Sequence, residues 1–105
     1  MDNQTLGKNY PATVSEAVKK MISELPKRDK VQIASMTESD LIGLHFSLGI
    51  YIRNTYGLWA DNKALMKSCR EISGDKNLHV DDASSLIIKE LWENLKKNNQ
   101  IRVVK

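Results

Sequence analysis

Two histidines and a few charged residues are the side chains of this chain whose types could support chemistry. His45 and Arg53 lie in the apolar stretch LHFSLGIYIRNTYGLW, and His79 and Asp81 lie in HVDDASS. Imidazole with carboxylate suits zinc or iron, and a guanidinium suits an anion. The two histidines do not stand at i and i+4, the spacing that places two ligands on one helix face. The four residues are therefore a candidate metal or anion pocket, but histidines packed in the core are the favoured interpretation and no cofactor is expected.

The single cysteine, Cys69, raises the alternative of a thiol enzyme. A thiol nucleophile needs a base and a third group that orients the base, and the neighbouring residues supply neither that group nor a strained turn. A small buried residue on a helix explains Cys69 more economically. A non-enzymatic protein is therefore favoured, with a small enzyme as the alternative.

Composition restricts the class of protein further. A chain of 105 residues with 41% hydrophobic content fits one domain. Its 16 basic and 13 acidic residues give a net charge of only +3, which argues against a nucleic-acid partner. The chain has no apolar run of the roughly 18 residues that a membrane span needs, and its N-terminus lacks the pattern of a secretory signal. We expect a cytoplasmic protein with no membrane association, and its oligomeric state is not predicted.

The first half of the chain predicts two helices after a flexible arm at residues 1–12. In TVSE, the Thr13 hydroxyl can accept from the Glu16 amide while the Glu16 carboxylate accepts from the Thr13 amide, which forms a capping box. Apolar residues at helical spacing then predict a helix over about 14–25, and Pro26 ends it. A second, short helix can start again from Pro26.

The second half predicts the longer helices. TESD, with Thr37 as the cap and Asp40 three residues on, starts a helix that continues to about residue 56 and ends at Gly57. NKALMKSCREI predicts a short fourth helix. A last helix runs from Asp81 or Asp82 to about Lys97, with a flexible tail at 98–105. The sequence thus predicts an all-α domain over 13–97, a compact bundle of four to five helices around a central buried helix at about 38–56.

Arg53 is the polar residue that this central helix must accommodate. On a wheel of about 100° per residue it falls between Ile42 and Phe46, facing protein. A buried guanidinium needs a carboxylate nearby, and Asp81 falls within the apolar stripe of the last helix. We therefore predict that Arg53 pairs with Asp81, or with the loop carbonyls beside it. Arg53→Ala should then destabilise the protein by several kcal/mol, because it strands a buried carboxylate.

Aromatic residues at helix ends are the candidates for binding a protein partner. Trp59 follows Gly57 and is either a lid on the core, which is the favoured interpretation, or an exposed anchor. Tyr56 shares that ambiguity. The sequence favours a helical protein-interaction module with a patch formed by Trp59, Tyr56 and His79, for a partner that it does not identify.

The stretch LHFSLGIYIRNTYGLW, followed by Leu65, Cys69 and HVDDASSLIIKELW, resembles a bacterial family described only as a domain of unknown function. The resemblance covers about residues 13–96 and implies a small helical domain, without an activity, substrate or partner to carry over. Where the pattern leads us to expect a helix-opening proline, this chain has Val80. The matching motif positions are His45, Arg53, Asn54, Gly57, Trp59, Cys69, His79, Asp81, Asp82, Ala83 and Ser84.

Overall fold

The computed structural model describes residues 10–59 and 62–104, with side chains as far as Lys97. In these ranges the chain forms five α-helices and one 3-10 helix, and no strand. The prediction of an all-α fold is therefore confirmed. In chain order the elements are α1 (Val14–Glu24), α2 (Lys27–Ala34), η1 (Glu38–Leu44), α3 (Leu48–Thr55), α4 (Lys63–Ser73) and α5 (Val80–Val104).

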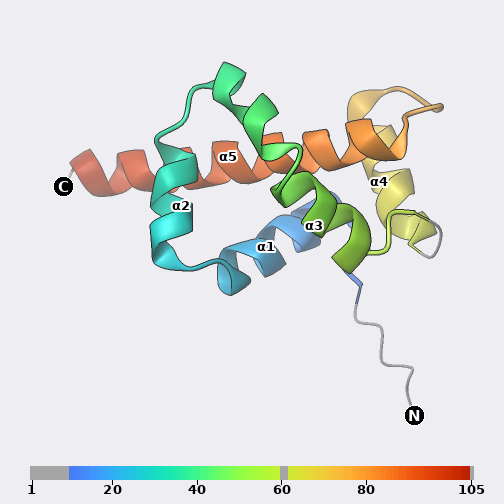
Figure 1. Ribbon diagram of the computed structural model, residues 1–105, viewed down its shortest axis with the longest axis horizontal. Coiled ribbons are helices and arrows are strands. Elements are labelled where there is room, and N and C mark those ends of the chain that lie inside the picture. Colours follow the sequence, from blue (N-terminus) through green and yellow to red (C-terminus); the bar gives the residue numbers. More distant parts are fainter. Residues whose placement is uncertain (1–9, 60–61, 105) are drawn as a thin grey trace, which may run out of the picture.

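The helix at the centre of the bundle is α5, which packs against every other helix (Figure 1). It runs along the long axis of the molecule, with α4 packed near its start and α2 farther along. The predicted bundle around a central helix is thus confirmed, but the assignment of residues 38–56 to that position is wrong. Those residues divide into η1 and α3.

The division falls at residues 45–47 and has a local cause. The His45 amide bonds to the Ile42 carbonyl at 3.1 Å and the Ser47 amide to the Leu44 carbonyl at 3.2 Å, which is the i→i+3 pattern of a 3-10 turn. A 3-10 helix turns about 120° per residue instead of about 100°. The wheel positions predicted for Ile42 and Phe46 therefore fail, and these side chains are 74% and 77% exposed.

Both predicted capping boxes are present, one of them in altered form. The Thr13 hydroxyl accepts from the Glu16 amide at 3.1 Å, but the Glu16 carboxylate accepts from the Ala12 amide, at 3.0 Å, and not from Thr13. At η1, the Thr37 amide donates to the Asp40 carboxylate at 2.9 Å, as expected. The cap motif thus marked a helix start correctly without specifying that the helix is 3-10.

The turn from α3 to α4 is fixed by Gly57 and Asn62. Gly57 has a φ of +71°, the left-handed conformation predicted for it. The buried Asn62 accepts from the Leu65 amide at the start of α4 and donates to the carbonyls of Pro11 and Tyr56. Asn62 therefore links three segments of the chain.

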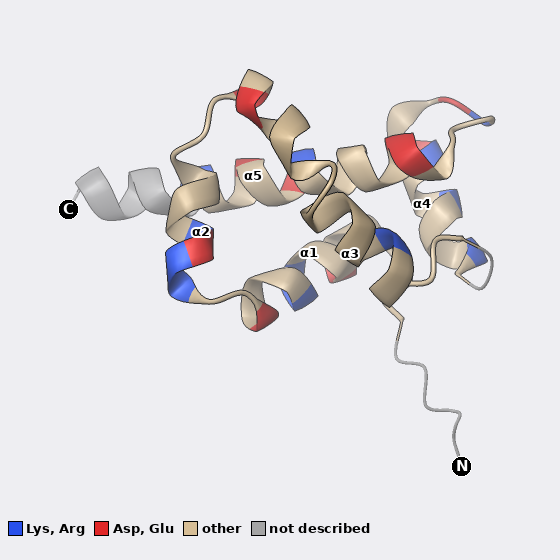
Figure 2. Ribbon diagram, in the orientation of Figure 1, with Lys and Arg blue, Asp and Glu red and all other residues tan. Residues whose placement is uncertain are grey.

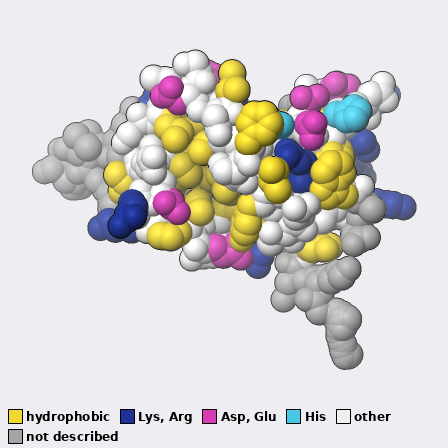
Figure 3. Space-filling view, viewed as in Figure 1, with side chains coloured by type: hydrophobic (Ala, Val, Ile, Leu, Met, Phe, Trp, Pro, Cys, Tyr) yellow, Lys and Arg dark blue, Asp and Glu magenta, His cyan; other side chains and the backbone are white. Residues whose placement is uncertain are grey.

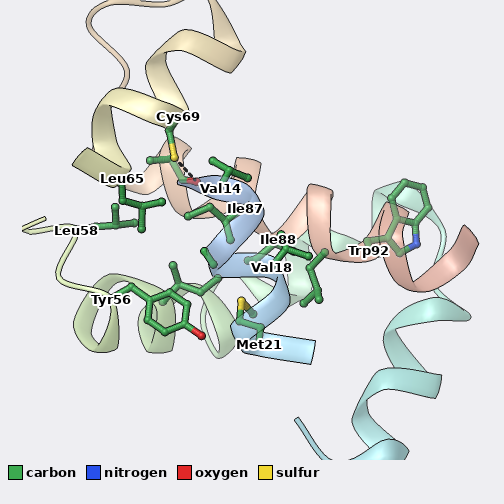
Figure 4. Close-up of a cluster of buried hydrophobic side chains, with 14 of the residues drawn as sticks. Val14, Val18, Met21, Tyr56, Leu58, Leu65, Cys69, Ile87, Ile88 and Trp92 are labelled. Atoms are coloured by element: carbon green, nitrogen blue, oxygen red, sulfur yellow. Dashed lines mark hydrogen bonds between the residues drawn. The ribbon is translucent and has the colours of Figure 1, made fainter. Parts of the chain in front are cut away.

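One hydrophobic core joins the helices, and Figure 4 shows part of it. Tyr56 points towards Met21 of α1, and Cys69 of α4 lies above Val14 and Ile87. Farther along α5, the Trp92 indole donates to the Met36 carbonyl at 2.9 Å. The largest fully buried side chains are those of Tyr56, Met21, Ile52, Leu65, Ile87, Ile88 and Leu91.

The observed boundaries at the two ends of the domain differ from the predicted ones or lie outside the described residues. α5 starts at Val80 and continues to Val104, beyond the predicted end at Lys97, and the side chains of the predicted tail 98–105 lie outside the described residues. Most of the predicted arm 1–12 also lies outside them. Among the described helices, none combines the length and the hydropathy that crossing a bilayer requires.

Candidate functional site

Arg53 is the centre of a polar cluster between α3 and α5. It is only 7% exposed, its Nη1 donates to the Ser84 hydroxyl at 2.9 Å, and its Nε lies 3.6 Å from Asp81 Oδ1. The predicted Arg53–Asp81 pair is therefore confirmed. The Asp81 side chain, however, is 58% exposed, because it lies in the first turn of α5 and not within its packed length. The expectation of a buried carboxylate is wrong.

Gly49 provides the space for this cluster. A Cβ at this position would lie 3.1 Å from Arg53 Nη1, 3.7 Å from Ser84 Oγ and 3.8 Å from His45 Nδ1. Polar side chains from α3, from α5 and from the 45–47 turn thus meet at the space that a Cβ of residue 49 would occupy. The absence of a side chain at Gly49 therefore leaves room for Ser84 of α5.

His45 bridges the 45–47 turn to α5. Its Nδ1 lies 3.3 Å from the Ser85 hydroxyl, and its ring meets Phe46 edge-to-face with centroids 5.4 Å apart. The Ser85 hydroxyl also donates to the Asp81 carbonyl, at 3.1 Å, so it can accept from the imidazole. In that arrangement a hydrogen bond between the His45 imidazole and the Ser85 hydroxyl joins the 45–47 turn to α5.

His79 differs from the other three residues of the predicted metal or anion pocket. It is exposed, and its side chain has no hydrogen bond or ion pair to any described residue. In the described ranges, no group of three or more His, Cys, Asp or Glu side chains is arranged to hold a metal ion. The structure thus brings His45, Arg53 and Asp81 together: His45 contacts Ser85, and Arg53 contacts Ser84 and Asp81.

Trp59 does not cover the core. It is 63% exposed, whereas the preceding Leu58 is 3% exposed and occupies the core position after Gly57. The Trp59 indole donates to the Asn54 carboxamide at 3.0 Å, and the Arg53 guanidinium carbon lies 6.0 Å from the indole centroid. The favoured expectation of a lid on the core is wrong, because the Trp59 side chain is exposed. The alternative role as an anchor for a partner stays a prediction.

Tyr56 is buried, so it offers no surface to a partner. Its hydroxyl donates to Glu24 Oε1 at 3.0 Å, and the Tyr51 hydroxyl donates to the same oxygen at 2.9 Å. Burial and the hydrogen bond to Glu24 raise the pKa of Tyr56 well above its ordinary value. This pair of tyrosines joins α3 to the end of α1.

Exposed apolar side chains form a ridge along η1 and α3. Ile42, Phe46 and Ile50 follow at intervals of four, and Trp59 is tied to Asn54, the next position in that series. Their exposed fractions are 74%, 77%, 44% and 63%. Figure 3 shows hydrophobic side chains along these elements. Sequence reasoning missed Ile42, Phe46 and Ile50 because a continuous α-helix would have turned the first two towards protein.

A hollow of about 390 Å³ lies between α2 and α3. Its apolar side chains belong to the ends of α1, α2 and η1 and to α3, and Figure 3 shows the hydrophobic floor. Asp29 and Tyr51 lie among the polar lining residues. The volume falls at the lower end of the roughly 300–1,000 Å³ of ligand pockets. We call it the α2–α3 hollow, lined by Leu25, Asp29, Gln32, Ile33, Met36, Leu44, Ser47, Leu48 and Tyr51.

Cys69 lies away from this face, in the core. Burial raises the pKa of its thiol to about 11, and its Sγ lies 3.9 Å from the Ala83 carbonyl. A thiol with this pKa is almost wholly protonated near neutral pH. The structural interpretation of Cys69 explains both its burial and its contact.

Comparison with known proteins places the chain in a family. A search of the curated proteins and a search of the solved structures both returned no match. The model of a family described as Domain of unknown function (DUF6794) matches residues 10–95, which include every helix from α1 to α4 and most of α5. The match covers most of the chain, as the resemblance of the two motif stretches implied. The chain therefore belongs to this family, DUF6794.

Proposed function

We propose that this protein is a small, cytoplasmic, non-enzymatic module that binds another protein through the ridge of Ile42, Phe46, Ile50 and Trp59. The observation that carries the proposal is the exposure of these four large apolar side chains on η1, on α3 and in the turns that follow them. Contiguous exposed apolar surface on a soluble domain is typical of an interaction site. Aromatic side chains are also enriched among the residues that dominate binding energy.

The contacts beneath the ridge support this proposal because they limit the motion of its side chains. Trp59 is tied to Asn54, and Phe46 packs edge-to-face on His45, which contacts α5. A side chain that is already ordered loses less conformational entropy when a partner binds. The polar cluster around Arg53 then has a structural role, holding α3 against α5 under the binding face.

Site-specific photo-crosslinking in cells tests the proposal. A photoreactive phenylalanine analogue at position 46 should crosslink to a discrete protein. The matched control is the same analogue at Ile72 of α4, which is also an exposed apolar residue, at 54%. Its position outside the ridge predicts no crosslink to that protein.

The crosslinking result is informative only if each variant is folded. Each variant should keep the helical circular dichroism of the parent protein, since position 46 has few packing contacts to lose. A crosslinked band of equal strength from positions 46 and 72, or no band from 46 in a folded protein, would refute the ridge as the binding face.

A further inference from the structure

The α2–α3 hollow marks a place where the hydrophobic core is incompletely covered. Among the described residues, seven apolar side chains pack against the core while staying only partly buried, and four of them line this hollow: Leu25, Met36, Leu44 and Leu48. Leu25 is the C-cap of α1, Leu44 ends η1 and Leu48 begins α3. Helical elements thus end or begin around the hollow, and its apolar lining stays accessible within a volume of about 390 Å³, which is enough for a small ligand.

Most polar side chains of the hollow can accept hydrogen bonds but have no hydrogen left to donate. The Tyr51 hydroxyl directs its hydrogen to Glu24, at 2.9 Å, and the Ser47 hydroxyl donates to the Leu44 carbonyl at 3.4 Å. Both hydroxyl oxygens keep lone pairs that can accept from a ligand. The Asp29 carboxylate accepts only, and it makes no hydrogen bond or ion pair with a described residue. The hollow therefore favours a ligand that carries an O–H or N–H donor.

The charges at the start of α2 disfavour a charged ligand. Asp29 is flanked in the sequence by three cations, Lys27, Arg28 and Lys30, and Figure 2 shows basic and acidic residues side by side there. Among the described residues none of these cations forms an ion pair with Asp29, and Lys30 Nζ instead donates to the Ile22 carbonyl at 3.0 Å. A ligand ammonium would meet three cations around one carboxylate, and a ligand carboxylate would meet Asp29 inside the hollow. An uncharged donor group avoids both repulsions.

We propose that the α2–α3 hollow binds a small uncharged molecule with an apolar body and a hydroxyl group, an aryl or alkyl alcohol. The body packs on Met36 and the leucines around it, while the hydroxyl donates to Asp29. Gln32 also lines the hollow, and its carboxamide can donate a second hydrogen bond to the same hydroxyl. This site is separate from the proposed function, because no residue of the ridge lines the hollow.

Methionine methyl groups provide a local reporter of occupancy. The chain has four methionines, of which Met36 lines the hollow while Met21 and Met66 are buried in the core. In full-length protein isotope-labelled at the methionine methyl carbons, phenylpropanol should shift the Met36 signal in the NMR spectrum and leave the Met66 signal in place. Met36→Leu assigns the first signal by removing it. A Kd of about 1 mM is expected for so small a probe.

Two relatives of this probe test the hydroxyl donor and the absence of charge. The methyl ether of phenylpropanol keeps the apolar body but cannot donate, so it should bind about 2- to 10-fold more weakly, as expected for the loss of one hydrogen bond. Phenylpropylammonium should bind no more tightly than the alcohol. Asp29→Ala should weaken the alcohol to the level of its ether and leave the ether unchanged. The control Asp82→Ala removes the same charge from the first turn of α5, outside the hollow, and should change neither affinity.

Equal binding of the alcohol and its ether, or tighter binding of the ammonium, would overturn the assigned class of ligand. A shift of the Met66 signal without one of Met36, or no shift with any probe at about 10 mM, would overturn the site itself.

Other occupants are recognised by a photoreactive phenylalanine analogue at position 32 in cells. Capture of a discrete protein, or of a second copy of this chain, would assign the hollow to a protein surface and contradict the inference. Phe46→Ala should leave binding of the alcohol unchanged, so a failure at the hollow does not decide the role of the ridge. Loss of alcohol binding in folded Phe46→Ala would contradict the separation of the two sites and with it the inference.

Discussion

Replacement of Arg53 separates the packing of its side chain from its charge. Arg53→Ala removes two methylenes and a guanidinium from a side chain that is only 7% exposed as a residue. Each buried methylene contributes about 0.8 kcal/mol, and the space left behind adds to the loss. We expect Arg53→Ala to lower the free energy of unfolding by about 2–4 kcal/mol.

The electrostatic part of the effect should be small. Asp81 is mostly exposed, so water solvates its carboxylate when the guanidinium is gone. Ser84 Oγ still donates to the Asp81 carbonyl, at 2.8 Å, and is not left unsatisfied. Arg53→Met keeps the apolar stem and removes the cost of burying a charge, so it should change stability by less than about 1 kcal/mol.

Urea unfolding followed by far-ultraviolet circular dichroism measures both variants. The expected order of stability is wild type and Arg53→Met close together, with Arg53→Ala well below them. Equal destabilisation by Met and Ala would refute the reasoning, because the ionic contacts and not the packed stem would then carry the stabilisation. Asp81→Asn should cost less than about 1 kcal/mol on the same grounds.

Three further predictions concern a glycine, a carboxylate and the thiol. Gly49→Ala should lower the free energy of unfolding by about 1 kcal/mol, because the new Cβ would lie 3.1 Å from Arg53 Nη1. The control Gly43→Ala, whose Cβ would have no atom within 4 Å, should change that free energy by less than about 0.5 kcal/mol. Thermal melts of both variants measure the difference. Burial alone raises the pKa of Glu24, but hydrogen bonds from two tyrosine hydroxyls and a nearby lysine outweigh it, so the pKa lies below the ordinary 4.5. Because the folded pKa is depressed, the carboxylate stabilises the fold above pH 4.5 and this stabilisation is lost as pH falls through the folded pKa. Urea midpoints against pH should show that loss, and Glu24→Gln should lack it; identical pH profiles would contradict the assignment. Cys69, with its pKa raised to about 11 from 9.0, should react with iodoacetamide roughly 100-fold more slowly in the native protein than in denaturant, and fast native labelling would show that the thiol is accessible.

The sequence predicted the features that depend on short-range chemistry. Thr13 and Thr37 mark helix starts because their caps involve residues three positions away. Gly57 marks the end of α3 because its left-handed conformation is local. Arg53 could be paired with Asp81 because a buried cation requires a carboxylate and α5 offers one near its start.

The features that sequence reasoning missed depend on helix type and on position along a helix. Residues 38–47 satisfy the same apolar spacing as an α-helix, so the change to 3-10 geometry and the outward turn of Ile42 and Phe46 leave no signal in the pattern. A helical wheel also treats every turn as equally packed. It therefore placed Asp81 in the apolar stripe, although the first turn of α5 is exposed on that side.

Trp59 and Tyr56 show the same limit at a turn. Both are large aromatic residues beside Gly57, and composition alone predicts similar burial for the two. The left-handed Gly57 reverses the chain direction between them, which leaves Tyr56 in the core and Trp59 at the surface. Of the aromatic residues predicted to bind a partner, Trp59 is therefore exposed and Tyr56 is buried.

In the proposed arrangement the ridge binds a partner while the Arg53 cluster holds α3 against α5, and crosslinking in two mutant backgrounds tests this division of roles most directly. The photoreactive residue at position 46 reports partner contact in each. With Trp59→Ala the crosslink yield should fall while the melting temperature stays near that of the parent protein. With Arg53→Met both should be retained. Loss of the crosslink in folded Arg53→Met, with full yield in Trp59→Ala, would contradict the account and assign partner recognition to the buried cation.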